Sequence, residues 1–225
     1  MIRVVLADDE VLIRAGVRAI LAADPEIEVV AEAADGHQAV DLARRHRPDI
    51  ILLDIRMPGL DGLAAAAEIR RAAPGTGVVV LTTFSEDDYI DRALAEGASG
   101  FLLKTGAPRE LIAGVRAVAE GAAYLSPRVA RRVVSEYGAA TRSGRRPGGA
   151  ATRDELAGVL TERELRVLAL VGAGRTNREI AAELHVVEGT VKAYVSAILG
   201  RIGVRNRVEA AIVAYKAGLV PDEPS

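Results

Sequence analysis

The 225-residue chain contains no cysteine and no tryptophan, and aromatic residues make up only 3% of it. Lack of cysteine excludes a disulfide framework, a cysteine-ligated zinc site and a thiol nucleophile. The three histidines are far apart in the sequence, which argues against a histidine-rich metal site. Hydrophobic runs stay short of the roughly 18 residues that span a bilayer, and the first residues lack the apolar core of a signal peptide. These absences predict a soluble, cytoplasmic protein with no membrane partner and with cores built from alanine, valine, leucine and isoleucine.

Charge is distributed unevenly along the chain. Residues 1–126 carry 13 basic and 20 acidic side chains, whereas residues 127–153 carry seven basic and one acidic. The remaining residues, 154–225, are close to neutral. Nucleic-acid phosphates would repel the acidic first part, so we expect the two ends of the chain to perform separate tasks.

The first 120 residues alternate between short β-branched runs and longer helical patterns. The predicted strands are apolar on both faces, as in parallel strands that helices cover on both sides: Arg3–Ala7, Ile27–Ala33, Asp49–Leu53, Gly77–Thr82 and Ser99–Leu102. The predicted helices have apolar residues at i, i+3 and i+4: Val11–Ala22, Gln38–Arg45, Leu63–Ala72, Asp87–Ala95 and Glu110–Ala119. Five βα units predict an α/β domain at residues 1–121 with a doubly wound, five-stranded parallel sheet.

A linker is predicted at residues 122–154, with a short helix at about 127–137. Within it, Gly138–Ala151 consists largely of Gly, Ala, Ser, Pro and Arg and has no hydrophobic periodicity, which is typical of a flexible tether. Arg142, Arg145 and Arg146 leave a second interpretation open, an accessory arm that binds phosphates.

Residues 155–220 have a helical pattern throughout. Thr161 and Glu164 have the spacing of a capping box and begin an amphipathic run that ends at Gly172. Three more helices follow it, at Thr176–Leu184, Glu188–Arg201 and Arg205–Ala217. Two short helices joined by the turn His185–Val187 in an all-α, four-helix domain predict a helix-turn-helix.

Polar side chains follow several of the predicted strands. Asp8 and Asp9 come after the first strand and Asp54 after the third, and these two strands are neighbours in a doubly wound sheet. Three carboxylates at close range repel one another unless a proton or a hard cation compensates them, and Mg²⁺ prefers such oxygen ligands. Thr82 ends the fourth strand and Lys104 follows the fifth. A hydroxyl and an ammonium that face carboxylates can hold a phosphoryl group.

The polar residues occur in motifs that resemble the receiver domain of bacterial two-component response regulators. The motifs are the pair Asp8–Asp9, LLDIRMPGLDG with Asp54, VVLTTF with Thr82, and GASGFLLK ending at Lys104. The resemblance covers residues 1 to about 120 and implies a flavodoxin-like fold with strand order 2-1-3-4-5.

This resemblance assigns roles to single residues. It implies that a histidine kinase phosphorylates Asp54 and that Lys104 holds a phosphoryl oxygen. The implied magnesium ligands are Asp9 directly, Asp8 mainly through water, Asp54 itself and the backbone carbonyl of Arg56.

The resemblance also implies a conformational switch. A phosphoryl group would draw the Thr82 hydroxyl towards it and vacate space for Phe101, three residues before Lys104. An ordinary core position is the alternative explanation of Phe101. Receivers usually have proline after the lysine, joined by a cis bond, but Thr105 occupies that position here. Because a non-proline cis bond costs about 2.5–4 kcal/mol, the sequence leaves the geometry of the Lys104–Thr105 bond open.

An enzyme is the less favoured interpretation of the same residues. A phosphatase of the haloacid dehalogenase type needs a second aspartate two residues after its nucleophile, as general acid. Arg56 occupies that position and cannot donate a proton at neutral pH. We expect no more than slow phosphorylation from small phosphodonors and slow hydrolysis of phospho-Asp54, with Arg56, Thr83 and Phe84 lining the approach of water.

The C-terminal helices resemble the LuxR-type DNA-binding domain of the NarL/FixJ class, over residues 156–220. The resemblance rests on LTERE at the entrance, NREIA in the second helix and TVK in the third. It implies that the third helix enters the major groove, where Lys192, Ala193 and Ser196 face base edges. Four residues of the implied interface are expected near the phosphate backbone: Asn177, Arg178, Thr190 and Tyr194. Solvent-exposed positions without DNA contacts are the alternative for Lys192 and Ser196.

The LuxR-type motif departs from the family pattern in ways that bear on affinity. Val187 stands where a serine usually caps the third helix, which costs about 1 kcal/mol. Tyr194 replaces the usual histidine, and the recognition helix has few basic residues, so dimerisation on neighbouring half-sites becomes important. The fourth helix carries apolar residues that either form the dimer surface or face the core: Val208, Ala211, Ile212 and Tyr215.

Together the motifs predict a DNA-binding transcriptional response regulator. Phosphorylation of Asp54 by a sensor histidine kinase would control homodimerisation and binding to double-stranded promoter DNA, with RNA polymerase as a further candidate partner. The alternative is a constitutively dimeric DNA-binding regulator whose receiver does not switch.

Overall fold

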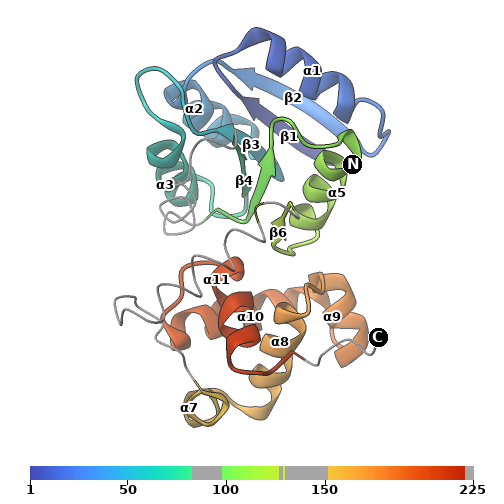
Figure 1. The fold of residues 1–225 in the computed structure, drawn as a ribbon, viewed down its shortest axis with the longest axis vertical. Helices are drawn as coiled ribbons and strands as arrows, with labels where there is room; N and C mark the ends of the chain where they lie inside the picture. Colours follow the sequence, from blue (N-terminus) through green and yellow to red (C-terminus); the bar gives the residue numbers. More distant parts are fainter. Residues whose placement is uncertain (83–97, 127–128, 130–151, 221–225) are drawn as a thin grey trace. The chain divides into compact units, whose positions relative to one another are not determined.

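The computed structural model describes residues 1–82, 98–126, 129 and 152–220 (Figure 1). It divides into two compact units, Met1–Ala119 with Tyr124–Ala130, and Glu120–Ala123 with Arg131–Ser225. The predicted helix Asp87–Ala95, the tether Gly138–Ala151 and nearly all of the helix at 127–137 lie outside the described residues. In the described part of the chain, no helix is both long enough and apolar enough to cross a membrane.

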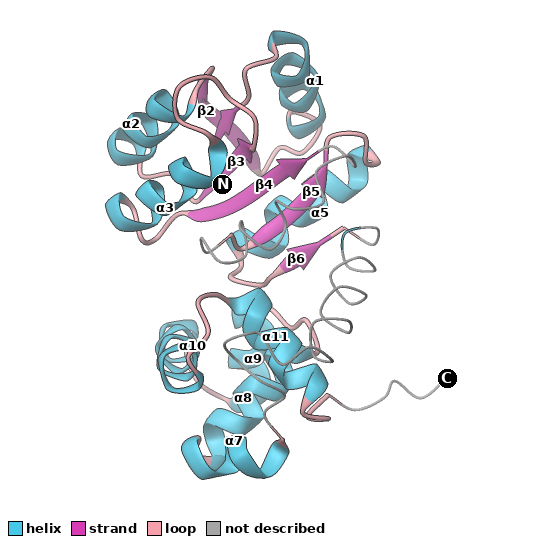
Figure 2. Ribbon diagram, turned by 60° about the vertical axis from the view of Figure 1, so that its left-hand side comes forward, coloured by secondary structure: helices cyan, strands magenta, loops and turns pink. Residues whose placement is uncertain are grey.

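The N-terminal unit contains a parallel sheet with strand order β2-β1-β3-β4-β5-β6 (Figure 2, magenta). The strands are β1 (Ile2–Ala7), β2 (Ile27–Ala33), β3 (Ile50–Asp54), β4 (Gly77–Thr82), β5 (Gly100–Leu103) and β6 (Tyr124–Leu125). The predicted order 2-1-3-4-5 is confirmed. The structure adds β6, which pairs with β5 at the edge and has only two residues, too few to produce a hydrophobic pattern.

The register of the sheet aligns the polar residues that follow its strands. Ala7 of β1 pairs with Leu53 of β3, so Asp8 and Asp54 are the next residues along two adjacent strands. Thr82 of β4 pairs with Leu103 of β5, and Lys104 follows directly. The predicted convergence of polar groups at the carboxyl edge therefore has a geometric basis in the strand pairing.

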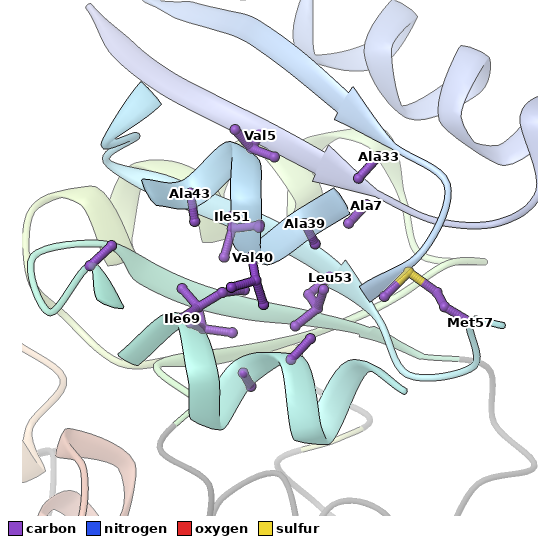
Figure 3. Packing of buried hydrophobic residues seen from close by; sticks show 14 residues of the cluster. Val5, Ala7, Ala33, Ala39, Val40, Ala43, Ile51, Leu53, Met57 and Ile69 are labelled. Carbon is purple, nitrogen blue, oxygen red and sulfur yellow. The ribbon is translucent and has the colours of Figure 1, made fainter. Parts of the chain in front are cut away.

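Helices cover both faces of this sheet, α2 (Gly36–His46) and α3 (Gly62–Ala72) on one side and α1 (Val11–Leu21) and α5 (Pro108–Ala119) on the other (Figure 1). Successive strand side chains point to opposite faces, so one strand feeds two cores. Residues such as Val5 and Ile51 pack with α2 and α3 (Figure 3), while Leu6 and Leu52 pack with α1 and α5. Both clusters consist almost entirely of aliphatic residues, as the composition predicts.

The described residues 152–220 of the C-terminal unit form helices around a hydrophobic core cluster. Its helices are α7 (Arg153–Val159), α8 (Glu162–Gly172), α9 (Asn177–Leu184), α10 (Glu188–Ile202) and α11 (Arg207–Lys216). The last four are the predicted ones. The capping box of Thr161 with Glu164 is present at the start of α8, and the seven-residue α7, too short for a clear periodicity, is an addition.

The N-terminus of α10 lacks a side-chain cap. Val187 occupies the cap position without a side-chain hydrogen bond, and it is 72% exposed. The first N–H groups of α10 therefore have no acceptor from this side chain, whereas Thr161 and Thr176 supply one to α8 and α9.

We predict that Val187→Ser increases the free energy of unfolding of the C-terminal unit by about 1 kcal/mol, because serine can accept a hydrogen bond from the first turn. Urea unfolding followed by circular dichroism measures the change. Val187→Ala is the control, since it shortens the side chain without adding an acceptor. Equal stability of the serine and alanine variants would contradict the prediction.

A second local feature ties the end of α1 to α5. The Arg116 guanidinium donates to both carboxylate oxygens of Asp24, at 2.7 Å from Nε and 2.8 Å from Nη2, and Nη2 lies 2.8 Å from Glu26 Oε2. The hydrogen bond from Arg116 lowers the pKa of Asp24 below its ordinary value of 3.8, with a smaller contribution from the Glu26 backbone. Because the pKa of Asp24 is lower in the folded state, the ionised carboxylate stabilises the fold at pH values above 3.8. This stabilisation is lost as the pH falls through the folded-state pKa.

We expect Asp24→Asn to lower the stability at neutral pH and to flatten the acid side of the stability profile below about pH 4. The effect is modest, because 41% of the Arg116 side chain is exposed and solvent screens the pair. Urea unfolding at a series of pH values tests this. A stability difference from the wild type that stays constant down to pH 2 would refute it.

Candidate functional site

The structure brings Asp8, Asp54 and Lys104 together at the carboxyl edge of the sheet. The Lys104 ammonium lies 2.8 Å from Asp8 Oδ2 and 3.0 Å from Asp54 Oδ2, and its side chain is only 6% exposed. Glu10 Oε1 is 3.8 Å from the same nitrogen. One cation thus joins carboxylates from two strands.

Backbone groups fix the two buried carboxylates. The Ile55 N–H donates to Asp54 Oδ1 at 2.8 Å, and the Glu10 N–H donates to Asp8 Oδ1 at 2.9 Å. In each case the second oxygen is the one that faces Lys104. The carboxylates are therefore oriented before any ligand arrives.

The peptide that follows Asp54 packs directly against the first residue of α3. The Gly62 N–H donates to Ile55 O at 2.8 Å, and a β-carbon at Gly62 would collide with the Asp54 carbonyl oxygen and lie 2.9 Å from Ile55 Cα. Only glycine allows this approach, so Gly62 sets how closely α3 supports the Asp54 loop.

Gly62→Ala should lower the free energy of unfolding by about 1–3 kcal/mol, because backbone atoms must move to admit the methyl group. Gly75→Ala is the matched control, since a β-carbon there meets nothing within 4 Å. Thermal and urea unfolding of both variants provide the comparison. If the two substitutions cost the same, the close packing on Asp54 does not carry this energy.

The environment shifts the titration of both charged partners. Burial raises the pKa of Asp54 to about 6, and the hydrogen bond from Lys104 limits the rise. Burial opposes the charge of Lys104, but its contacts with Asp8 and Asp54 outweigh that effect and raise its pKa. At neutral pH the site therefore holds an ionised Asp54 beside an ammonium.

A group of carboxylates near Lys104 has the arrangement of a cation site. Ligand oxygens of Asp8, Asp9 and Glu10 lie within 4.8 Å of one another, with Asp8 buried and the other two exposed. Asp8 Oδ2 is buried and, among the described residues, meets no hydrogen-bond donor besides its ion pair with Lys104. Carboxylate oxygens of this kind fit Mg²⁺, and the sequence prediction had omitted Glu10.

The remaining predicted receiver residues differ in how far they are buried. Thr82 is buried at the end of β4, Phe101 is fully buried on β5, and Arg56 is exposed two residues after Asp54. The core position expected for Phe101 as the alternative is thus observed, and its part in a switch stays a prediction. Thr83 lies outside the described residues. No peptide bond in the described part of the chain is cis, so the Lys104–Thr105 bond is trans.

In the C-terminal unit, α10 presents one face to the core and another to solvent. Val191 and Ile198 are buried, whereas Lys192, Ala193 and Ser196 are exposed. Two further predicted contacts, Thr190 and Tyr194, are half-buried, and Arg178 on α9 is exposed. The residues predicted to face base edges therefore share the open side of the helix.

Asn177 has a different environment. It is buried, and its Oδ1 accepts a hydrogen bond from Arg207 Nη1 at 2.7 Å. Arg207 also donates to the carbonyl of Arg175, and burial lowers its pKa to about 10. The structure thus gives the Asn177 side chain a role inside the unit, and sequence reasoning missed Arg207 because arginine is rarely buried.

The apolar stripe of α11 divides between core and solvent. Val208 is buried, Ala211 packs on the core cluster, and Tyr215 is 66% exposed. Ile212 is partly exposed. The core-facing expectation therefore holds for Val208 and Ala211, and the dimer surface stays a prediction.

Comparison with known proteins agrees with both units. Residues 4–116 match the response regulator receiver domain, and residues 158–214 match the luxR family of bacterial regulatory proteins. The transcriptional regulatory protein LiaR of Bacillus subtilis is 39% identical over 220 residues, which cover 98% of this chain and 100% of LiaR. DegU of Brevibacillus brevis is 38% identical over 224 residues, covering 97% of this chain and 95% of DegU.

Solved structures give the same result. The response regulator ChrA of a heme-sensing two-component system is 34% identical, with 97% of this chain and 98% of ChrA covered and a TM-score of 0.52. The receiver domain of NarL from Mycobacterium tuberculosis is 41% identical, with 53% of this chain and 97% of that domain covered and a TM-score of 0.52.

A parallel receiver sheet followed by a helix-turn-helix unit defines the class of two-component response regulators that act on transcription. Within that class, the chain belongs to the NarL/FixJ family, with a receiver domain and a LuxR-type DNA-binding domain. It is a DNA-binding transcriptional regulator rather than a classical enzyme.

Proposed function

We propose that a sensor histidine kinase switches this regulator by phosphorylating Asp54. The observation that carries the proposal is the buried Lys104 ammonium, 3.0 Å from Asp54 and 2.8 Å from Asp8. An Asp54 oxygen would attack the phosphorus of a phosphohistidine while the bond from phosphorus to the histidine nitrogen breaks. Lys104 would offset the negative charge on the transferred oxygens.

Mg²⁺ is the cofactor that this site fits. Asp8, Asp9, Glu10, Asp54 and the backbone carbonyl of Arg56 would hold it, and the ion would supply further positive charge next to the phosphoryl oxygens. The buried and otherwise unpaired Asp8 Oδ2 supports this assignment. Small phosphodonors would phosphorylate Asp54 slowly, and water would hydrolyse it slowly.

The response to phosphorylation would pass through the two adjacent strands β4 and β5. A phosphoryl group on Asp54 would draw the hydroxyls of Thr82 and Thr83 by charge-assisted hydrogen bonds. Phe101, paired with Val80 in the neighbouring strand, would then move into the vacated space. The changed receiver surface would promote homodimerisation.

DNA recognition is assigned to the open face of α10. Lys192, Ala193 and Ser196 would read base edges in the major groove, with Thr190, Arg178 and Tyr194 near phosphates. Asn177 would steady the start of α9 through Arg207. The linker at residues 122–154, between a receiver at 1–121 and a DNA-binding domain at 155–220, would let two copies occupy neighbouring half-sites in the cytoplasm, where RNA polymerase also binds promoters.

Phosphorylation is testable by the oligomeric state of the full chain after incubation with Mg²⁺ and acetyl phosphate. We expect the wild type and Asp41→Asn to shift from monomer to dimer in light scattering, and Asp54→Asn to remain monomeric. Asp41 is an exposed carboxylate on α2 and serves as the matched control. A dimer at every condition, with no phosphate incorporated, would favour the second candidate, a constitutive DNA-binding dimer with a non-switching receiver.

The DNA-binding assignment predicts that Lys192→Ala weakens specific binding by about 1–3 kcal/mol, the usual contribution of a side chain bidentate to guanine. Lys216→Ala, at the exposed end of α11, is the control and should leave the affinity nearly unchanged. Fluorescence anisotropy with a selected operator measures both. An equal loss for the two variants would mean that Lys192 contributes charge alone.

A further inference from the structure

Arg14 on α1 contacts the acidic turn, although neither the motifs nor the phosphoryl chemistry assigns it a role. Its Nη1 donates to the backbone carbonyl of Asp8 at 2.6 Å, and its Nε donates to Glu32 Oε2 at 3.3 Å. Only 14% of the Arg14 side chain is exposed. The guanidinium therefore connects the turn after β1 to a carboxylate of β2.

The hydrogen bond to Asp8 restrains the residue that follows. The Asp8 carbonyl and the Asp9 N–H belong to one planar peptide unit, so holding the carbonyl fixes the direction in which the chain enters Asp9. The turn is also held at its two ends, since Asp8 N donates to Ala33 O at 3.2 Å and Arg14 N donates to Glu10 O at 3.0 Å. Arg14 thus contacts the turn through both its backbone and its side chain.

We propose that Arg14 is a positioning residue that sets the affinity of the acidic cluster for a divalent cation, by orienting Asp9 through the Asp8 carbonyl. The inference rests on the proposed function, because it takes Asp8, Asp9 and Glu10 as the cation site. Glu32 holds the guanidinium in place and offsets its charge, with 32% of the Glu32 side chain exposed.

A positioning role and a purely electrostatic role of Arg14 predict opposite changes in the affinity for Mg²⁺. A positive charge beside a cation site repels the cation, so an Arg14 that acted by charge alone would weaken Mg²⁺ binding, and its removal would strengthen it. An Arg14 that orients the ligands has the reverse effect, since loss of an outer partner usually weakens metal binding by about 10–100-fold.

The test is an Mg²⁺ titration of the full chain, followed by NMR at the amides of Asp9 and Glu10. We expect Arg14→Met to weaken binding about tenfold, at the lower end of the range for outer partners. Arg14→Lys keeps the charge but replaces the planar, two-point donor, and it should also weaken binding. Arg18→Met is the matched control, because Arg18 ion-pairs with the same Glu32 at 3.4 Å but 62% of the Arg18 side chain is exposed. The affinity of the Arg18→Met variant for Mg²⁺ should stay within about twofold of the wild type.

Each result has a definite meaning. Unchanged or tighter Mg²⁺ binding in Arg14→Met overturns the positioning role. Absence of Mg²⁺ binding to the wild type overturns the proposed magnesium site itself, which separates the two failures. Circular dichroism reports whether the variants fold, and if Arg14→Met unfolds, Arg14→Lys decides alone: weaker binding supports the proposal and wild-type affinity overturns it.

Discussion

The receiver site depends on one buried ammonium that balances two carboxylates. Asp8 and Asp54 come from strands that the chain order separates by more than forty residues, and Lys104 contacts both. Without that cation the two buried carboxylates would repel each other. Removing one partner of such a group leaves an uncompensated buried charge, which in proteins generally costs about 3–5 kcal/mol.

The parallel sheet brings Asp8, Asp54 and Lys104 close enough together for this charge balance. The pairs Ala7–Leu53 and Thr82–Leu103 place the next residue of each strand at a common edge. Supporting contacts then fix the loops: Gly62 allows α3 to approach the Asp54 peptide, and Arg14 holds the Asp8 carbonyl. The aliphatic cores on the two faces keep the strands in register. The positions of the site residues at the carboxyl edge of the sheet therefore depend on the packing of these cores.

In the C-terminal unit, the helix α10 contributes both to the core and to the exposed surface. The side of α10 with Val191 and Ile198 completes the core, and the other side exposes Lys192 and Ser196. Because the two sets alternate at helical spacing, the same residues that stabilise the fold determine which side chains face outward. A weakly capped N-terminus at Val187 is compatible with this division, since the core contacts of α10 stabilise the helix.

Most of what could be predicted from the sequence rests on the periodicity of apolar residues and on the order of the motifs. Five strands, four helices of the second unit and the convergence of Asp8, Asp54 and Lys104 follow from such patterns, whereas the strand order follows from the resemblance to receiver domains. β6 and α7 are too short to leave a periodic signal. Arg14 and Arg207 could not be assigned because their partners, a backbone carbonyl and a buried amide, become neighbours only in three dimensions.

The stripe of α11 shows another limit of the sequence. Apolar residues at helical spacing are common to core faces and to dimer surfaces, so the pattern alone cannot divide Val208 from Tyr215. Burial separates them in the structure, with Val208 inside and Tyr215 exposed.

The most direct test of the central claim is a crystal structure of the full chain with Mg²⁺ and beryllium fluoride, a mimic of the phosphoryl group. We expect an adduct on the Asp54 carboxylate, with the Lys104 ammonium in contact with a fluorine and the magnesium ion against Asp8 and Asp9. An adduct on another carboxylate, or a Lys104 that makes no contact with the group on Asp54, would contradict it.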